Sequence, residues 1–91
     1  MKTVKREATV GFDDKNDALV TVTPCEAGQG IRVELTSPVK RQYGEHLEEV
    51  VLEVAKTAGY TDVKINVQDK GAWDYALRAR VEAALARGDA Q

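Results

Sequence analysis

Few side chains in this chain could act as a nucleophile, a proton carrier or a metal ligand. The sequence holds one histidine, one cysteine and one serine: His46, Cys25 and Ser37. Nucleophilic catalysis needs a nucleophile beside a base, and a structural zinc site needs several thiolate or imidazole ligands. The three residues lie far apart in the sequence, so we predict no catalytic site and no metal site. We expect a half-buried structural role for His46, a helix cap at Ser37 and an unreactive loop thiol at Cys25.

An acidic run is the next candidate for chemistry. Asp13-Asp14-Lys15-Asn16-Asp17 carries three carboxylates, and calcium prefers such oxygen ligands. An EF-hand loop also needs a glycine at its sixth position and a glutamate at its twelfth. Ala18 stands at the sixth position and Pro24 at the twelfth, so we interpret the carboxylates as solvated acids of a turn. Gly71 lacks the further glycines of a nucleotide-binding loop and is expected to serve a turn.

The last apolar segment carries two arginines and two aromatic residues that could contact a partner. Arg78 and Arg80 lie on opposite sides of a predicted helix, so at least one should face water, where it could contact a partner. Trp73 and Tyr75 fall on different faces. We expect a core Trp73 and a surface Tyr75, and the alternative that one of them is an exposed interface anchor stays open.

Four short segments, two of them with strict alternation of apolar and polar residues, predict the strands that must position these side chains. The turn-type cluster between the first two strands indicates a hairpin, and the loop 24–30 separates the second from the third. The predicted strands are about Glu7–Phe12, Ala18–Thr23, Ile31–Thr36 and Val63–Val67.

Two segments have the 3.6-residue period of amphipathic helices. The first is expected to start with Ser37 as N-cap and Pro38 at the first helical position, to be interrupted at Gly44 and to end at Gly59. The second follows a turn at Asp69-Lys70-Gly71 and ends at Gly88, with Asp74 and Arg78 as an ion pair one turn apart. The first apolar stripe is Val39, Tyr43, Leu47, Val50, Val51, Val54 and Ala58, and the second is Trp73, Leu77, Val81, Ala84 and Leu85.

The order β-β-β-α-β-α predicts an α+β two-layer sandwich with the two helices packed on one face of a four-stranded mixed sheet. The first two strands form a hairpin, and the third and fourth can be parallel through a right-handed crossover. We expect a single domain over residues 1–91 with a core of about 7–87. The first five or six residues and Asp89-Ala90-Gln91 are expected to be loose ends.

Composition narrows the function classes. A chain of 91 residues with 13 basic and 15 acidic side chains supports one two-layer core without a deep catalytic cavity. Its basic residues are scattered among acids, which argues against nucleic-acid and membrane-surface partners. The apolar runs fall short of the roughly 20 residues of a spanning helix, and one cysteine gives no internal disulfide. We expect a non-catalytic protein of the cytoplasm.

Three segments carry a resemblance to a known family. They are Gln42-Tyr43-Gly44, Val67-Gln68-Asp69-Lys70-Gly71-Ala72 and Leu77-Arg78-Ala79-Arg80-Val81-Glu82-Ala83. Together they resemble the acyl carrier subunit, the gamma chain, of bacterial citrate lyase, and malonate decarboxylase has a more distant relative of that subunit. The resemblance runs from about Gly11 to Ala86. The segment from Ser37 to Gly44 matches one that usually reads Ser-x-Val-x-x-Gln-Phe-Gly in the family.

The resemblance implies a non-catalytic carrier. In the family a serine holds a phosphoribosyl-dephospho-coenzyme A arm whose thiol carries acetyl and citryl groups, and lyase-type catalytic subunits perform the chemistry. An arm tethered on an exposed hairpin keeps its thioester at high effective concentration for neighbouring active sites. The resemblance thus places the cofactor-binding position on the predicted hairpin and implies lyase-type catalytic subunits as partners.

The hairpin departs from the family pattern at that position. Where the family reads approximately Gly-Thr-Leu-Glu-Ser-x-Asp, this chain has Lys15 in the place of the serine. A lysine amine does not accept the arm through the same phosphodiester linkage, which leaves three hypotheses. The chain is a carrier or carrier-derived subunit of a citrate-lyase-type complex. It is a cofactor-free structural or regulatory subunit that holds lyase chains through a strand edge or the Arg78 side of its last helix. Or Lys15 holds a different arm as an amide, as biotinyl and lipoyl domains do. Against all three stands the reading of Lys15 as a solvated turn cation.

Overall fold

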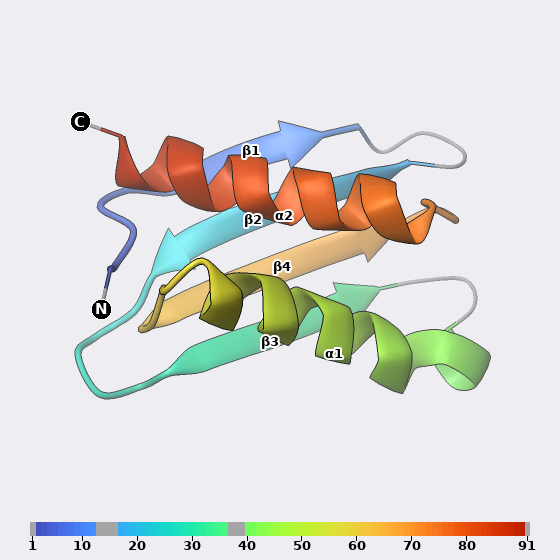
Figure 1. Cartoon of the computed structure of the whole chain (residues 1–91), viewed down its shortest axis with the longest axis horizontal. Helices are drawn as coiled ribbons and strands as arrows, with labels where there is room; N and C mark the ends of the chain where they lie inside the picture. Colours follow the sequence, from blue (N-terminus) through green and yellow to red (C-terminus); the bar gives the residue numbers. More distant parts are fainter. Residues whose placement is uncertain (1, 13–16, 37–39, 91) are drawn as a thin grey trace.

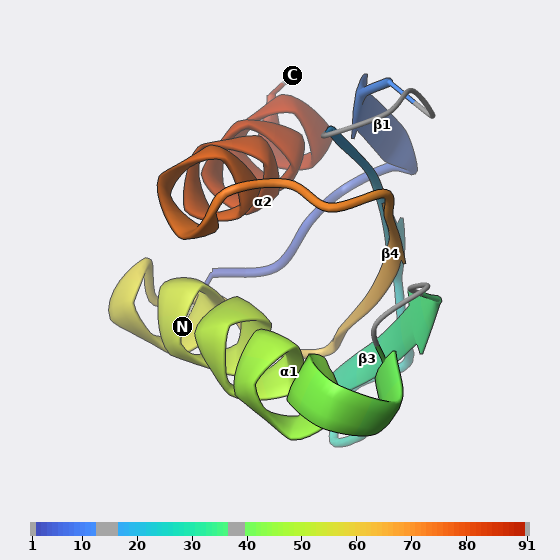
Figure 2. The ribbon, with the colours of Figure 1, turned by 90° about the vertical axis from the view of Figure 1, so that its right-hand side faces the viewer.

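A computed structural model describes residues 2–12, 17–36 and 40–90, and within these ranges it shows four strands and two helices. Both helices cover the same face of the sheet (Figures 1 and 2). The predicted α+β sandwich is therefore confirmed, in the predicted order. The elements are β1 (Ala8–Gly11), β2 (Ala18–Pro24), β3 (Ile31–Thr36), α1 (Lys40–Thr57), β4 (Val63–Asp69) and α2 (Asp74–Asp89).

The sheet has the strand order β1-β2-β4-β3. The pair β1–β2 is antiparallel, as the hairpin prediction required, and so is the pair β2–β4. The pair β3–β4 is parallel, with Val33 opposite Ile65, and α1 makes the connection between the two strands. The edges of the sheet are therefore β1 and β3, and β4 lies in its interior.

The core lies between the sheet and the helices because alternate strand residues point to one face. Val20 and Val22 on β2, and Val63, Ile65 and Val67 on β4, are fully buried there. Burial of each such side chain contributes roughly 1.5–3 kcal/mol of transfer free energy. The opposite face of the sheet is polar. The hydroxyl groups of Thr9 and Thr21, for example, lie 3.1 Å apart across the β1–β2 pair.

The end of α1 follows the sequence prediction, and its start lies outside the described residues. Gly59 has a φ of +86°, and Tyr60 N donates to Ala55 O at 3.0 Å. This is the left-handed termination that favours glycine. The predicted cap and first turn, Ser37 and Pro38, are not described, and the helix is described from Lys40 on.

Two predictions about α2 are wrong. Trp73 precedes the helix and is 68% exposed, so it does not belong to the buried stripe. Gly88 does not end the helix, which continues to Asp89. A Cβ on Gly88 would lie 3.0 Å from Arg6 O and 3.0 Å from Val22 Cγ2. Glycine at this position thus allows close approach of the helix to the N-terminal segment. The sequence prediction interpreted the same glycine as the end of the helix.

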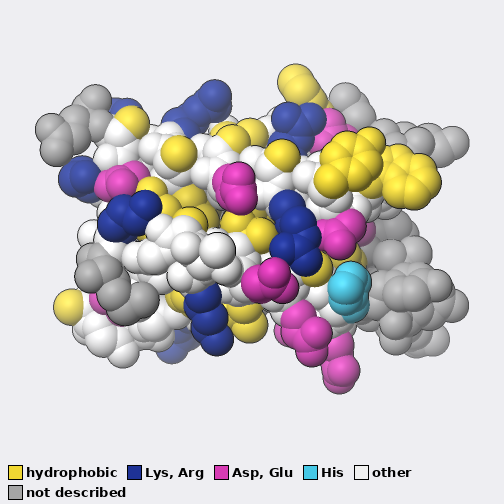
Figure 3. All heavy atoms as spheres, viewed as in Figure 1, with side chains coloured by type: hydrophobic (Ala, Val, Ile, Leu, Met, Phe, Trp, Pro, Cys, Tyr) yellow, Lys and Arg dark blue, Asp and Glu magenta, His cyan; other side chains and the backbone are white. Residues whose placement is uncertain are grey.

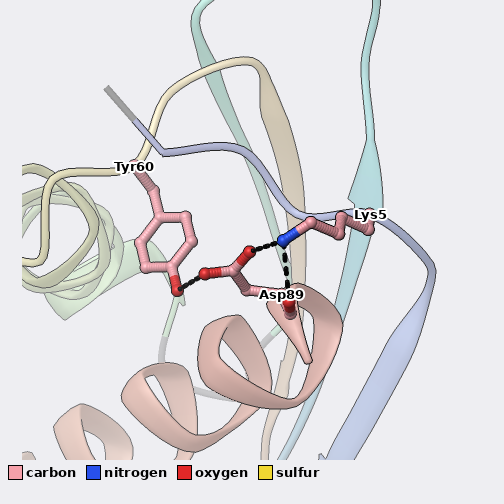
Figure 4. Close-up of polar contacts among 3 residues, drawn as sticks. All are labelled: Lys5, Tyr60 and Asp89. Carbon is pink, nitrogen blue, oxygen red and sulfur yellow. Dashed lines mark hydrogen bonds and ion pairs between the residues drawn. The ribbon is translucent and has the colours of Figure 1, made fainter. Parts of the chain in front are cut away.

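Residues 2–5 and Asp89 are tied down, which corrects the prediction that these end segments are loose. Val4 is 3% exposed and belongs to the core. The Lys5 ammonium donates to the Asp89 carboxylate at 2.7 Å, and the Tyr60 hydroxyl donates to the same carboxylate at 3.0 Å (Figure 4). Lys2 N donates to Gly59 O at 2.8 Å. Residues 2–5, the end of α1 and the end of α2 therefore meet in one hydrogen-bonded cluster.

Candidate functional site

The hairpin between β1 and β2 is the segment to which the resemblance assigns the cofactor position. Lys15 and its neighbours 13, 14 and 16 lie outside the described residues, whereas both sides of the hairpin base are described. On one side, Gly11 has a φ of +102°, and a Cβ there would collide with Ala18 O. Only glycine fits this backbone position without strain. The backbone at the base of the hairpin therefore requires a glycine, and the sequence has Gly11 at that position.

Asp17, on the other side of the hairpin base, is clamped to α2. Arg80 donates from Nε and from Nη2 to its two carboxylate oxygens, at 3.2 and 3.1 Å. The Ala18 backbone N–H donates to the same carboxylate at 2.7 Å. This backbone hydrogen bond, followed by the Arg80 hydrogen bond, lowers the pKa of Asp17 below its ordinary 3.8. A paired guanidinium–carboxylate fork fixes orientation as well as distance. The fork therefore sets the orientation of the hairpin base relative to α2.

A second contact joins the hairpin base to the β4–α2 turn. Lys70 N donates to Asp17 O at 2.9 Å. The turn itself is built by Asp69, which is 2% exposed and accepts from the backbone N–H groups of Gly71 at 3.3 Å and Ala72 at 2.9 Å. An Asp side chain that bonds the backbone two and three residues ahead is typical of such turns. Gly71 has a φ of +94°, which fits the predicted turn role.

The aromatic ring of Phe12 completes the hairpin base. It is 61% exposed, and the Arg80 guanidinium lies 5.8 Å from its ring centroid. That distance is within the range of a cation–π contact. Arg80 is thus held between a carboxylate and an aromatic ring, both from the hairpin.

This arrangement can present a side chain, but the described residues supply no catalytic set around it. Among them, no group of three or more His, Cys, Asp or Glu side chains could hold a metal ion. Asp13 and Asp14, which belonged to the calcium alternative, lie outside the described residues. Within the described ranges there is also no helix of the length and apolarity that crossing a membrane requires.

The remaining candidates from the sequence are dispersed. His46 is exposed, which corrects the expectation of a half-buried histidine. It lies at the N-terminal part of α1, beside the connection from β4 to α2. Cys25 is partly buried in the β2–β3 loop, where its backbone N–H donates to Asp62 O at 3.0 Å. Ser37 lies outside the described residues. The structure therefore brings neither His46 nor Cys25 to the hairpin base.

Both arginines of α2 are engaged within the chain. Arg78 donates to Asp74 at 2.8 Å, the predicted pair one turn apart, and also to Glu53 of α1 at 3.2 Å. Arg80 bonds Asp17, which is 63 positions away in the sequence. Helical spacing indicated that the two arginines diverge. It gave no signal for Asp17 as the partner, because the pairing depends on how α2 lies across the sheet.

Comparisons with known proteins cover nearly the whole chain. The acyl carrier protein family described as malonate decarboxylase delta subunit (MdcD) matches residues 5–88. The citrate lyase acyl carrier protein of Fusobacterium nucleatum is 42% identical over 84 residues, covering 92% of this chain and 88% of the relative. Citrate lyase acyl carrier protein 2 of Salmonella typhimurium is 40% identical over 91 residues, covering 100% of this chain and 92% of the relative.

A solved structure shares the fold. A chain in the crystal structure of a Pseudomonas malonate decarboxylase hetero-tetramer in complex with malonate superposes with a TM-score of 0.66 at 23% identity, covering 91% of this chain and 84% of that chain. At this identity the superposition speaks for the fold alone, and the family match comes from the sequence relatives. The chain belongs to the citrate lyase acyl carrier protein family.

Proposed function

We propose that this protein is a non-catalytic carrier-type subunit of a citrate-lyase-type complex in the cytoplasm, with lyase-type catalytic subunits as its protein partners. The relatives named as citrate lyase acyl carrier proteins support this assignment across nearly the whole chain. The observation that carries it structurally is the Asp17–Arg80 fork. It joins the hairpin, where the family carries its arm, to the Leu77–Ala83 segment, which is one of the segments that resemble the family.

The fork suits a carrier because a mounting point must project while its base stays rigid. Gly11, Asp17 and Lys70 N fix the base from three sides. The tip residues between them extend beyond the ends of β1 and β2 in sequence. A side chain at such a tip reaches active sites on other polypeptides without disturbing the core.

The chemistry of the hairpin does not fit the serine-linked arm of the family. Residues 11–17 include no serine and no threonine, so no hydroxyl is present there to form the phosphodiester. We therefore expect the hairpin to lack the phosphoribosyl-dephospho-coenzyme A arm at Lys15. This favours the second hypothesis, a cofactor-free structural or regulatory subunit of the complex, and leaves an amide-linked arm on Lys15 as the alternative.

Intact-mass measurement on the protein purified from its native host tests the state of the hairpin. An unmodified mass supports the cofactor-free structural or regulatory subunit. A mass increased by a biotinyl or lipoyl group that maps to Lys15 supports the amide-linked arm. A phosphoribosyl-dephospho-coenzyme A adduct would show that the serine-free hairpin is loaded after all. Co-purification with lyase-type subunits tests the assignment to the complex, and a monomer that binds none of them would contradict it.

Restoring the hydroxyl tests whether the hairpin is still a carrier mount. Lys15→Ser, incubated with the attachment enzyme of a citrate lyase system, should accept the arm. Adding Arg80→Gln should reduce loading, because the fork that orients the hairpin is removed. Adding Arg78→Gln is the matched control, since Arg78 bonds Asp74 and Glu53 and no hairpin residue in the described part of the chain. Equal loading of the two double variants would show that the fork does not position the hairpin.

A further inference from the structure

Large aromatic side chains are exposed at the hairpin end of the molecule. Among the described residues, the large hydrophobic side chains that remain exposed are Phe12, Trp73 and Tyr75, and the latter two are 68% and 73% exposed. Phe12 lies against Arg80, whereas Trp73 and Tyr75 lie at the start of α2. Figure 3 shows large hydrophobic side chains projecting at this end of the helical face. Exposed Trp and Tyr side chains are typical of the energetic centres of protein interfaces.

Trp73 lines a cavity of about 490 Å³. The apolar part of its lining comes from Leu47 and Val50 of α1 and from Ala72 and Trp73 of the connection between β4 and α2. The lining is mostly apolar, and the volume is in the range of ordinary binding pockets. It therefore has room for one or two large side chains of another protein.

The charge around the cavity favours one kind of occupant. Asp74 lines it and is exposed, and the exposed acids Glu45 and Glu49 lie on α1 within one turn of His46, another lining residue. Arg78 is held by Asp74 and Glu53. Acidic side chains are visible on the same part of the helical face in Figure 3. Among the described residues these acids outnumber the exposed Lys70, which lies between the lining residues Asp69 and Gly71, so the rim favours basic side chains over carboxylate or phosphate ligands.

We propose that Trp73, Tyr75 and this cavity form the docking surface for a lyase-type catalytic subunit. The partner segment places an aliphatic or aromatic side chain in the cavity, between Leu47 and Trp73, and basic side chains opposite Glu45, Glu49 and Asp74. The inference rests on the proposed function, because that function supplies the partner. Docking here would place the partner at the end of the molecule where β1 ends and where β2 and α2 begin, which is the end of the hairpin base (Figure 1).

Trp73 supplies a direct readout because it is the only tryptophan of the chain. The lyase-type catalytic subunits of the native host, purified with their tryptophans replaced by phenylalanine, are titrated into the full-length protein. We expect the Trp73 emission to shift to shorter wavelength and its quenching by acrylamide to fall, since the exposed ring becomes covered. Binding without either change would overturn the proposal. The same shift on raising the concentration of this protein alone would indicate self-association and would also overturn it.

Variants of this protein distinguish the proposed docking surface from other surfaces. Their binding to the unsubstituted catalytic subunits is measured by calorimetry. Trp73→Ala should weaken binding by about 30-fold or more, as truncation of an aromatic interface centre does. Glu49→Lys should weaken it by about threefold to tenfold, with a smaller dependence on salt. Glu26→Lys, the same charge change in the exposed β2–β3 loop, is the matched control and should leave binding unchanged. Circular dichroism checks that each variant is folded.

The outcomes distinguish this inference from the function on which it rests. If the wild type binds and Trp73→Ala binds equally well, the docking surface is wrong while the proposed function stands. Loss of binding by Glu26→Lys to the same extent as by Glu49→Lys would assign the charge effect to the whole molecule and contradict a local surface. If the wild type binds no lyase-type subunit, the proposed function fails and this inference fails with it.

Discussion

The two ends of the sandwich are built differently. At the end that holds residues 2–5 and the last turn of α2, called here the terminal end, Lys5, Tyr60 and Asp89 are joined by side-chain hydrogen bonds. Asp62 accepts there from two backbone N–H groups of the β2–β3 loop, at 3.1 Å for Gly28 and 2.9 Å for Gly30. At the hairpin end the Asp17–Arg80 fork fixes the base, but aromatic side chains and a cavity stay open to solvent. The contrast indicates that side-chain hydrogen bonds add stability at the terminal end, whereas the hairpin end combines a fixed backbone at its base with the surfaces available for partners.

The largest expected effect is at Gly11, a position of the hairpin end that tolerates no side chain. Gly11→Ala would place a methyl group against Ala18 O at a φ of +102°, and we expect a loss of at least about 3 kcal/mol of unfolding free energy. Gly28→Ala is the control, because Gly28 also has a positive φ, +90°, but its Cβ would meet open space. It should cost about 1 kcal/mol, from backbone strain alone. Equal losses in urea denaturation would show that the close contact at Gly11 has no energetic weight.

The corresponding position at the terminal end is Gly88. Gly88→Val should cost about 2–3 kcal/mol because its side chain would have to displace Val22 and the backbone at Arg6. Ala86→Val, on the exposed side of the same helix, tests the effect of β-branching alone and should cost less than about 1 kcal/mol. Thermal unfolding of the two variants measures the difference. If the variants unfold together, α2 does not need its close approach to the N-terminal segment.

Two tyrosines, one buried at the terminal end and one exposed at the hairpin end, allow the two ends to be compared directly. Tyr60 is 4% exposed and donates to Asp89, whereas Tyr75 is 73% exposed. Tyr60→Phe should cost about 1 kcal/mol by leaving the Asp89 carboxylate without that donor, and Tyr75→Phe should leave stability unchanged. Chemical denaturation of both variants measures this. A comparable loss in Tyr75→Phe would contradict the assignment of stability to the terminal end.

The smallest expected effect is a dependence on acid pH. The Lys5 ammonium and then the Tyr60 hydroxyl lower the pKa of Asp89 below 3.8. The ionised carboxylate therefore stabilises the folded state fully above about pH 4 to 5, and this contribution is lost as pH falls through the lowered pKa. Asp89→Asn should be less stable than the wild type at neutral pH and should approach it in stability as pH falls below 4. A gap that stays constant from pH 7 to pH 2 would argue against a stabilising Asp89 carboxylate.

The sequence predicted the elements well because most of their signals are local. Alternation in Ile31–Thr36 gave β3 with the predicted bounds, and Gly59 gave the end of α1. The predictions that failed depend on contacts across the molecule. Trp73 matched the helical stripe by spacing, yet it precedes α2 and is 68% exposed. Gly88 matched a helix stop, but its role is to let α2 approach Val4 and Val22.

The candidate site was located in part. The turn-rich composition around Asp17 and the resemblance placed a hairpin there, and the hairpin base lies where β1 ends and β2 begins. Its clamp was not foreseen, because a carboxylate and a guanidinium 63 positions apart leave no periodic trace in a single sequence. His46 was misjudged for a related reason: helical spacing gives the face of a residue, and only the position of the neighbouring elements gives its depth.

By itself the sequence determined the strands, the helices, the one-sided layering and the family, because periodicity, turn residues and motif identity are properties of neighbouring residues. The tertiary structure decided which distant groups share a contact: Arg80 with Asp17, Asp89 with Tyr60, and the aromatics with the cavity. Such contacts depend on the crossing of α2 over the sheet and on the close approach at Gly88. Their geometry is fixed by packing of the whole core, which no local pattern encodes.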